Sequence, residues 1–333
     1  MINRVLGIIV ITTSFLAAWL MMDFNQFKST PLNIPANGTV YLLKPGSSVS
    51  SLANDLAAQG VVEKPLYLKI LARLDGSAPK IKAGEYNIPQ GTTPASLLAL
   101  LVAGEVVSHS LTLVEGWTFR EVLQAVAGSP VLVHTLEQLS DSEIMDRLEM
   151  AGEHPEGRFL PDTYHFPRGT TDLAFLKRAA KAMDQVLEAK WPERDENLPL
   201  KTAYEALILA SIVEKETGLA SERPEIAGVF VRRLQKGMKL QTDPTVIYGI
   251  GESFDGNIRR SDLTRDTPYN TYTRNGLTPT PICMPGIDAI DAVLHPKSGK
   301  ALYFVAKGDG SHYFSGTLEE HNKAVRKYQL KRK

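Results

Sequence analysis

The chain has 333 residues, of which 43% are hydrophobic and 22% are charged, a composition typical of globular proteins. This length leaves room for two or three domains. The 37 basic and 37 acidic residues balance, which argues against a nucleic-acid-binding protein. Cys283 is the only cysteine, so an intramolecular disulfide is excluded.

An uncharged apolar segment occupies residues 5–22, between Arg4 and Asp23. Eighteen helical residues span about 27 Å, close to the thickness of a bilayer core of about 30 Å. A cleaved signal peptide is the alternative, but its apolar region usually has about 7–15 residues. We therefore predict a transmembrane anchor at 5–22, with a short tail at 1–4 before it and a linker at 23–38 after it.

Three strand–turn–helix units follow, each with a glycine at the turn and a hydroxyl residue before the helix. They span 39–62, 84–107 and 110–126, and a further helix is predicted at 64–74. The third unit is assigned to the next domain, so 39–108 is predicted to form a small domain of its own. The expected capping residues are Ser47, Thr92 or Thr93, and Thr118.

The rest of the chain, 109–333, is predicted to form a mixed α+β domain, which makes the fold class α+β. A turn-rich aromatic loop at 156–164 is of the kind that lines a groove, although packing on the surface is equally open. The predicted helices are 136–152, 174–191, one that Ser221 caps and Gly237 ends, and a last one capped by Thr317; a hairpin pairs 302–306 with 312–315.

The most informative element is a predicted helix in the middle of this domain. Thr202 and Glu205 have the spacing of a capping box, so the helix should begin at Ala203. Gly218 lies where a left-handed residue would end it. Residues 206–213 carry no charge on any side, so this helix is predicted to be buried all round.

Two glutamates lie at the end of that helix. At 100° per residue Glu216 lies over Leu209 and Ile212, whereas Glu214 points to roughly the opposite side. Desolvation at the end of an apolar helix raises the pKa of a carboxyl group towards neutral pH, as a general acid requires. The alternative reading is a polar helix end in which both side chains are solvated.

Four stretches, ASIVEKET, VFVRRL, LQTDPTVIYG and PYNTYTRNGLTPTPI, together closely resemble the YceG-like endolytic murein transglycosylases. The resemblance covers nearly the whole chain and is strongest in 207–285. It implies that Glu216, the second glutamate of the Glu-Lys-Glu triplet, is the catalytic residue. It also implies a cytoplasmic N-terminus, with the rest of the chain on the periplasmic side of the inner membrane.

Further expectations come from the same resemblance. The small units at 39–108 resemble LysM modules, which bind the sugar backbone of peptidoglycan, although they could equally serve only for packing. Lysozyme-like transglycosylases have a groove lined by a glutamine-bearing turn and by Tyr and Asn contacts. Glu214 is a further substrate-binding candidate, or it holds Arg232 or Arg233 in a structural role. The lining candidates are Gln241, Thr242, Asp243, Asn270 and Tyr272.

Several other chemistries lack their motifs. Seven histidines are scattered without paired spacing, which argues against a transition-metal site, and no cofactor is expected. There is no Gly-x-Ser-x-Gly sequence and no phosphate-binding glycine loop. His312 and His321 are interpreted as surface or packing residues. Carboxylate chemistry remains as the plausible class.

The sequence therefore predicts a membrane-anchored enzyme that cuts peptidoglycan strands between N-acetylmuramic acid and N-acetylglucosamine and leaves 1,6-anhydro ends. It would limit the length of nascent strands, with peptidoglycan synthases as candidate partners. A muramidase and a non-catalytic cell-wall scaffold are the alternatives. A hydrolase needs a second carboxylate, and only the loops of Asp162 and Asp243 could bring one to the groove.

Overall fold

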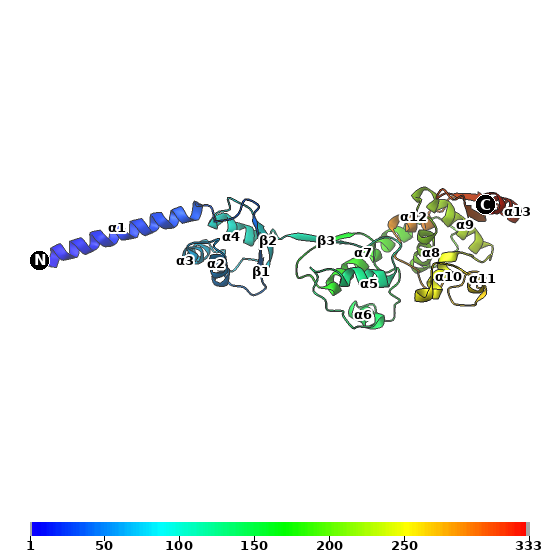
Figure 1. The fold of residues 1–333 in the computed structure, drawn as a ribbon, viewed down its shortest axis with the longest axis horizontal. Helices are drawn as coiled ribbons and strands as arrows, with labels where there is room; N and C mark the ends of the chain where they lie inside the picture. Colours follow the sequence, from blue (N-terminus) through cyan, green and yellow to red (C-terminus); the bar gives the residue numbers. More distant parts are fainter. Residues whose placement is uncertain (1, 331–333) are drawn as a thin grey trace. The chain divides into compact units, whose positions relative to one another are not determined.

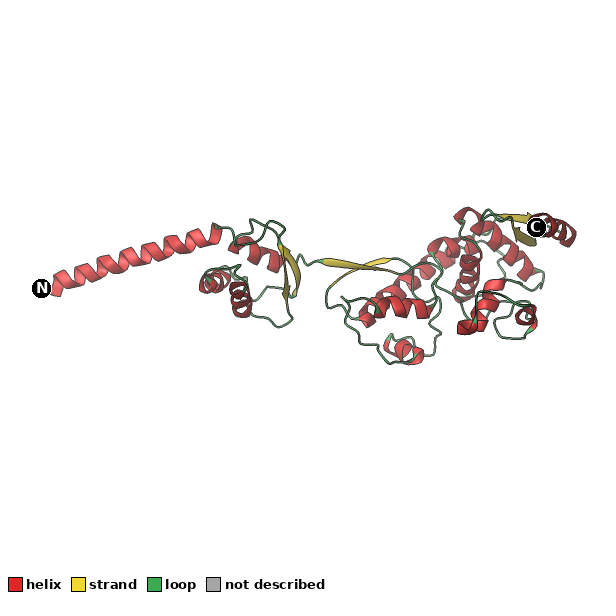
Figure 2. Cartoon of the chain, viewed as in Figure 1, coloured by secondary structure: helices red, strands yellow, loops and turns green. Residues whose placement is uncertain are grey.

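The computed structural model describes residues 2–330 and has the predicted mixed α+β composition with an apolar helix at its N-terminus. The chain forms two compact units. The first contains the residues up to 109 together with 165–169, and the second contains the remainder (Figure 1). Within the described residues the strands form three two-stranded sheets, and helices make up most of the ordered structure (Figure 2).

The N-terminal helix α1, Ile2–Ser29, contains the predicted anchor. Its length and apolar composition suit a membrane span, as they would suit a signal sequence. The C-terminal end of α1 contacts the rest of the first unit. The carboxylate of Asp23 accepts hydrogen bonds from Lys64 Nζ at 2.6 and 2.8 Å, and the ring of Phe27 contacts that of Tyr67 edge-on.

The first two strand–turn–helix units share one sheet. Their strands β1 and β2 pair antiparallel, with Tyr41 opposite Tyr86, and the helices cover this pair with a leucine-rich core. The caps are Ser48, one residue later than predicted, and Thr93, because these hydroxyls accept from the third amide of each helix. The elements are β1 Thr39–Leu43, α2 Val49–Ala58, α3 Pro65–Leu74, β2 Gly84–Ile88 and α4 Pro94–Ala103.

The third strand–turn–helix unit does not join that sheet. Its strand β3, Ser108–Thr112, pairs with β4, Thr163–Pro167, which the sequence did not suggest as a strand. Helix α5, Phe119–Ala127, begins at the predicted cap, Thr118.

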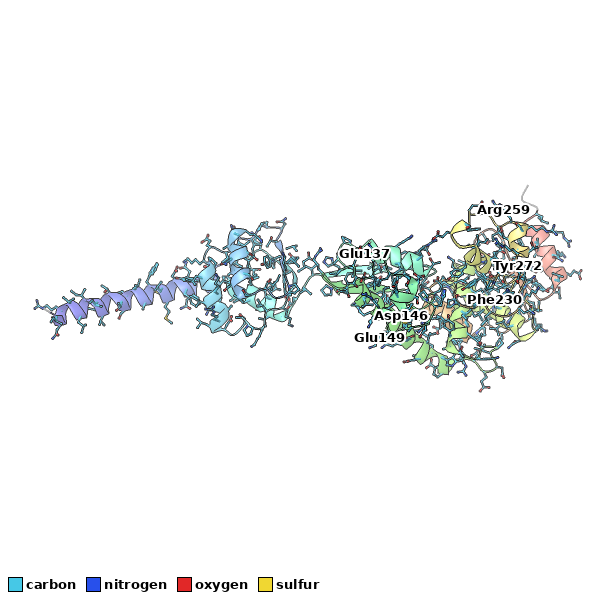
Figure 3. All side chains as sticks on the ribbon, turned by 90° about the horizontal axis from the view of Figure 1, so that it is seen from below. Glu137, Asp146, Glu149, Phe230, Arg259 and Tyr272 are labelled. Carbon is cyan, nitrogen blue, oxygen red and sulfur yellow. The ribbon has the colours of Figure 1, made fainter. Side chains whose placement is uncertain are left out.

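Helix α8, Ala203–Glu216, lies at the centre of the second unit and packs against α9, α10 and α12 (Figure 1). Every residue from 206 to 213 is buried, as predicted. Phe230 of α9, labelled in Figure 3, is 1% exposed in the same core. The remaining helices before the C-terminal hairpin are α6 Asp141–Arg147, α7 Asp172–Lys190, α9 Arg223–Gln235, α10 Asp243–Ile250, α11 Arg260–Thr264 and α12 Ile287–Leu294, with short 3-10 helices η1 Trp191–Glu193, η2 Ala220–Glu222 and η3 Gly251–Ser253.

Three predicted helix boundaries are wrong for local reasons. The predicted helix 136–152 shrinks to α6, because Ser140 caps it and Glu149 takes a left-handed φ of 67° just beyond it. Helix α8 ends through Thr217 in an extended conformation, not through a left-handed Gly218. Ser221 does not cap α9, because it lies inside η2.

The C-terminal elements match the prediction. Strands β5, Tyr303–Ala306, and β6, His312–Ser315, form an antiparallel hairpin. Helix α13, Leu318–Tyr328, begins with a capping box made by Thr317 and Glu320.

Candidate active site

Glu216, the last residue of α8, lies in the wall of a cavity of about 470 Å³. The other walls come from Arg233 of α9, from residues 240–243, from the β5–β6 hairpin and from α13. All of these elements belong to the second unit. The buried α8 thus delivers one carboxyl group to an open space large enough for part of a sugar chain.

The surroundings of Glu216 raise its pKa towards neutral pH. Burial raises its pKa to about 7, and the nearby charge of Asp243 acts in the same direction. The hydrogen bond from Thr242 and the positive charge of Arg233 act in the opposite direction, as a protonated His312 would, and are outweighed. Glu216 therefore has the acidity that a general acid and base needs near pH 7.

A group of threonines orients that carboxyl group. Thr242, only 1% exposed, donates a hydrogen bond from Oγ1 to Oε1 of Glu216. Its backbone N donates to Thr271 Oγ1 at 3.1 Å, and Thr245 Oγ1 donates to its carbonyl at 2.8 Å. Gln241 precedes it with φ of 50°, an uncommon value that turns the chain sharply into α10. Thr242 thus contacts the catalytic candidate directly.

The structure brings four of the six proposed substrate-binding residues to the cavity. Gln241, Thr242, Asp243 and Tyr272 all line it. The hydroxyl of Tyr272, which Figure 3 labels, donates to Asp243 Oδ1 at 2.6 Å. Asn270 does not line it: this residue is 1% exposed, and its amide donates to the carbonyls of residues 262, 263 and 265.

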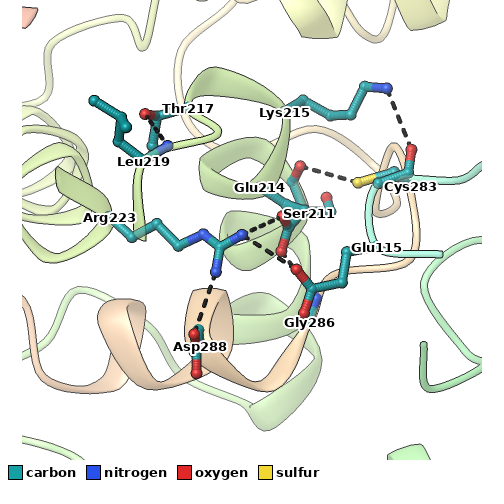
Figure 4. A network of polar contacts seen from close by, with 11 residues as sticks. Glu115, Ser211, Glu214, Lys215, Thr217, Leu219, Arg223, Cys283, Gly286 and Asp288 are labelled. Carbon is teal, nitrogen blue, oxygen red and sulfur yellow. Dashed lines mark hydrogen bonds and ion pairs between the residues drawn. The ribbon is translucent and has the colours of Figure 1, made fainter. Parts of the chain in front are cut away.

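Glu214 also lies away from the cavity, in the polar network of Figure 4. Its Oε1 accepts from Arg223 Nη2 at 2.8 Å, and its Oε2 accepts from the backbone N of Gly286 at 2.9 Å. The same guanidinium group reaches Glu115 at 3.2 Å and Asp288 at 3.4 Å. Burial raises the pKa of Glu214. This geometry fits a structural role, which joins α8 to the start of α12.

The predicted partner of Glu214 is therefore wrong, because both Arg232 and Arg233 bond to carbonyl groups. Arg232 Nε donates to the carbonyl of Ala301 at 2.7 Å. Arg233 Nε donates to the carbonyl of Leu302 at 2.7 Å, and its guanidinium lies over the ring of Tyr303, 5.0 Å from the centroid. These contacts attach the hairpin to α9 and give the cavity a buried positive charge.

The loop at 156–164 contributes nothing to this cavity. Its first residue, Glu156, lines a different cavity of about 620 Å³ and accepts from Tyr248 OH at 3.1 Å. Asp162 is exposed and lines neither space. Of the two candidates for a second carboxylate, only Asp243 lies in the cavity wall.

Sequence reasoning missed the contribution of the C-terminus. His312 and His321, which were interpreted as surface or packing residues, line the cavity with Tyr303. Their spacing to Glu216 in the sequence carries no signal, because only the tertiary fold places the hairpin beside α8. Within residues 2–330 no cluster of His, Cys, Asp or Glu could hold a metal ion.

Comparisons with known proteins identify the family. The sequence profile of the YceG-like family matches residues 41–327. An "Endolytic murein transglycosylase" from Bacillus subtilis (strain 168) is 33% identical over 301 residues, which cover 85% of this chain and 82% of that protein. One of the same name from Streptococcus pneumoniae (strain D39 / NCTC 7466) is 30% identical, covering 92% of this chain and 59% of its own. A crystal structure of a YceG-like protein from Listeria monocytogenes matches with a TM-score of 0.54 and 31% identity, over 87% of this chain and 100% of that one. The chain therefore belongs to the YceG-like family.

Proposed function

We infer that this protein is an endolytic murein transglycosylase, an enzyme that cleaves the glycan strands of peptidoglycan internally. The two named relatives above carry that activity in their names. The observation that carries the inference is the carboxyl group of Glu216, which has a pKa of about 7 and lies at the end of a buried helix in a cavity. The proposed bond is the one between N-acetylmuramic acid and N-acetylglucosamine.

One carboxyl group is enough for this reaction. Glu216 first protonates the glycosidic oxygen, and the bond from that oxygen to C1 of the muramic acid breaks. The resulting carboxylate then takes the proton of the 6-hydroxyl of the same sugar, and O6 bonds to C1. The product is a 1,6-anhydro end, no water is consumed, and Glu216 regains its proton. Thr242 stabilises the intermediate carboxylate, because its hydroxyl donates to Oε1.

Because of Asp243, a muramidase is the second candidate function. It lines the same cavity, so it could serve as the second carboxylate of a hydrolase. One observation favours a different use for it: its Oδ1 already accepts a hydrogen bond from the hydroxyl of Tyr272. We assign Asp243, Gln241 and Tyr272 to substrate binding.

The remaining parts of the chain are proposed to bring the enzyme to its substrate. Residues 5–22 anchor it in the inner membrane, with residues 1–4 in the cytoplasm, and 39–108 form a LysM-like module that binds glycan. The catalytic domain is 109–333. Support comes from the exposed apolar side chains of α1 and from the compact sheet-and-helix unit that follows it. Strands close to the membrane are then the natural substrate, and synthases of peptidoglycan the natural partners.

Digestion of purified peptidoglycan by the enzyme and by its Glu216→Gln variant tests the function. General acid–base catalysis contributes about 10²–10⁴-fold, so the variant should lose at least that much activity. Glu137→Gln, which changes an exposed carboxyl group that does not line the cavity, is the control and should cleave normally. Normal cleavage by Glu216→Gln would refute Glu216 as the catalytic acid, whereas no cleavage by the native protein would support the non-catalytic scaffold alternative.

A further inference from the structure

The Glu216 cavity contains a second ionisable side chain that the mechanism above does not use. His312, the first residue of β6, lies in the cavity wall. Its Nδ1 bonds to Oε2 of Glu222 at 2.7 Å, and its backbone N donates to Oε1 of the same carboxylate at 2.9 Å. Both side chains are mostly buried, at 12% exposure for His312 and 16% for Glu222. One carboxylate of η2 thus holds both the backbone and the ring of one cavity residue.

These two hydrogen bonds to Glu222 decide which ring nitrogen is left free to bind a ligand. A carboxylate only accepts hydrogen bonds, so the proton on Nδ1 points to Glu222. The ring is also fixed by its edge-on contact with Phe304, at a centroid distance of 5.4 Å. Nε2 has no hydrogen-bond partner among the described residues, and this atom is not fully buried. It is therefore at least partly exposed, in a residue that lines the cavity.

The proton on Nδ1 decides what Nε2 can offer to a ligand. In the neutral ring with the proton on Nδ1, Nε2 carries a lone pair and accepts a hydrogen bond. The groups of a glycan that donate such bonds are its hydroxyls and its acetamido N–H. The other ionisable groups around the cavity are Arg233, Asp243, Tyr272, Tyr303 and His321.

We propose that His312, held by Glu222, is a substrate-contacting residue whose Nε2 accepts a hydrogen bond from a hydroxyl of the sugar bound beside Glu216. The proposal rests on the function inferred above. Its physical consequence is positional: the sugar is held from the hairpin side while Glu216 acts from the end of α8. Glu222 does not touch the sugar and acts through the ring that it orients.

Two substitutions of nearly equal size separate this role from a purely structural one. In His312→Gln the amide oxygen reaches the position of Nε2, so the contact with the sugar is kept. In His312→Asn the amide reaches only the position of Nδ1, so the bond to Glu222 is kept and the contact with the sugar is lost. The proposal predicts that the Gln variant binds and cleaves glycan better than the Asn variant. A structural role of the His312–Glu222 pair predicts the reverse order.

Binding is measured with peptide-free glycan strands on the full chain in detergent, in a Glu216→Gln background that holds the strands without cutting them. One hydrogen bond contributes about 0.5–1.5 kcal/mol, so the Asn variant should bind roughly 2- to 10-fold more weakly than the Gln variant. His295→Asn and His295→Gln are the matched controls. The exposed ring of His295 pairs with Asp195 at 2.9 Å, and His295 does not line the cavity. They should bind equally.

The possible results are distinct. Equal binding by the two His312 variants, or tighter binding by His312→Asn, would overturn the proposal and leave the function of Glu216 untouched. Full cleavage by Glu216→Gln alone would overturn the proposed function instead. Thermal unfolding of each variant shows whether weaker binding reflects a lost contact or a lost fold. An Asn variant that binds weakly but has the same melting temperature as the Gln variant supports the contact.

Discussion

The raised pKa of Glu216 makes the stability of the second unit depend on pH, and Glu216→Gln should remove that dependence. The pKa rises from 4.5 to about 7, so the folded state prefers the protonated carboxyl group more than the unfolded state does. Below pH 4.5 both states are protonated and nothing is lost. As the pH rises from 4.5 to about 7, the carboxyl group ionises in the unfolded state while the folded state keeps it protonated, so stability falls; above about pH 7 both states are ionised and the loss levels off. Glutamine resembles the neutral form and avoids this cost.

The size of the effect follows from the shift. Each pKa unit corresponds to 1.36 kcal/mol, so the rise from 4.5 to about 7 costs about 3 kcal/mol of folding free energy at pH 8. At pH 5 the same calculation gives less than about 1 kcal/mol. Because the Gln side chain can still accept the bond from Thr242, we expect the variant to be more stable than the native protein at pH 8 by about 3 kcal/mol, and nearly equal at pH 5.

Urea unfolding followed by tryptophan fluorescence measures this difference, since Trp117 and Trp191 both report on the second unit. The control is Glu137→Gln, because the side chain of Glu137, labelled in Figure 3, is exposed. The stability of this variant should depend on pH in the same way as that of the native protein. If the Glu216→Gln and native proteins lose stability in parallel between pH 5 and pH 8, the carboxyl group is not the buried acid described here.

Three further outcomes are expected. Thr242→Val removes a hydrogen bond that lowers the pKa of Glu216, so the pH profile of cleavage should move to higher pH; an unchanged profile would contradict that contact. Arg223→Met leaves the buried carboxylate of Glu214 without its cation and should destabilise the second unit by about 3–5 kcal/mol in urea unfolding, whereas a loss below about 1 kcal/mol would contradict the structural role. Removal of residues 1–22 should give a soluble protein that still cuts glycan, and a mature N-terminus found past this segment in cells would identify a signal peptide instead.

Features of this structure could be predicted from the sequence where neighbouring residues specify them. The cap at Thr118, the capping box at Thr317 and the burial of the uncharged run in α8 were predicted correctly, because each is specified by neighbouring residues. Spacing along α8 also separated Glu214 from Glu216 correctly, since helical geometry alone puts them on different sides. Ends that depend on one residue's backbone conformation, such as Glu149 with φ of 67°, were missed.

The site itself was only half visible. Gln241, Thr242 and Asp243 could be predicted because they belong to a stretch that resembles the family. The ring of His312 and the guanidinium of Arg233 were not, because their roles depend on long-range packing of the hairpin against α9. Likewise, the buried state of Asn270 and its bonds to three carbonyls follow from a loop conformation that no periodicity encodes.

The identity of the new sugar end tests the central claim most directly. Peptidoglycan strands are digested in ¹⁸O-labelled water, and the ends are identified by mass spectrometry. If Glu216 alone acts as acid and then as base, the 6-hydroxyl attacks C1, and the products end in unlabelled 1,6-anhydro-N-acetylmuramic acid, lighter by one water than a reducing end. Labelled reducing ends as the main product would contradict this account and point to hydrolysis with Asp243 as the second carboxylate.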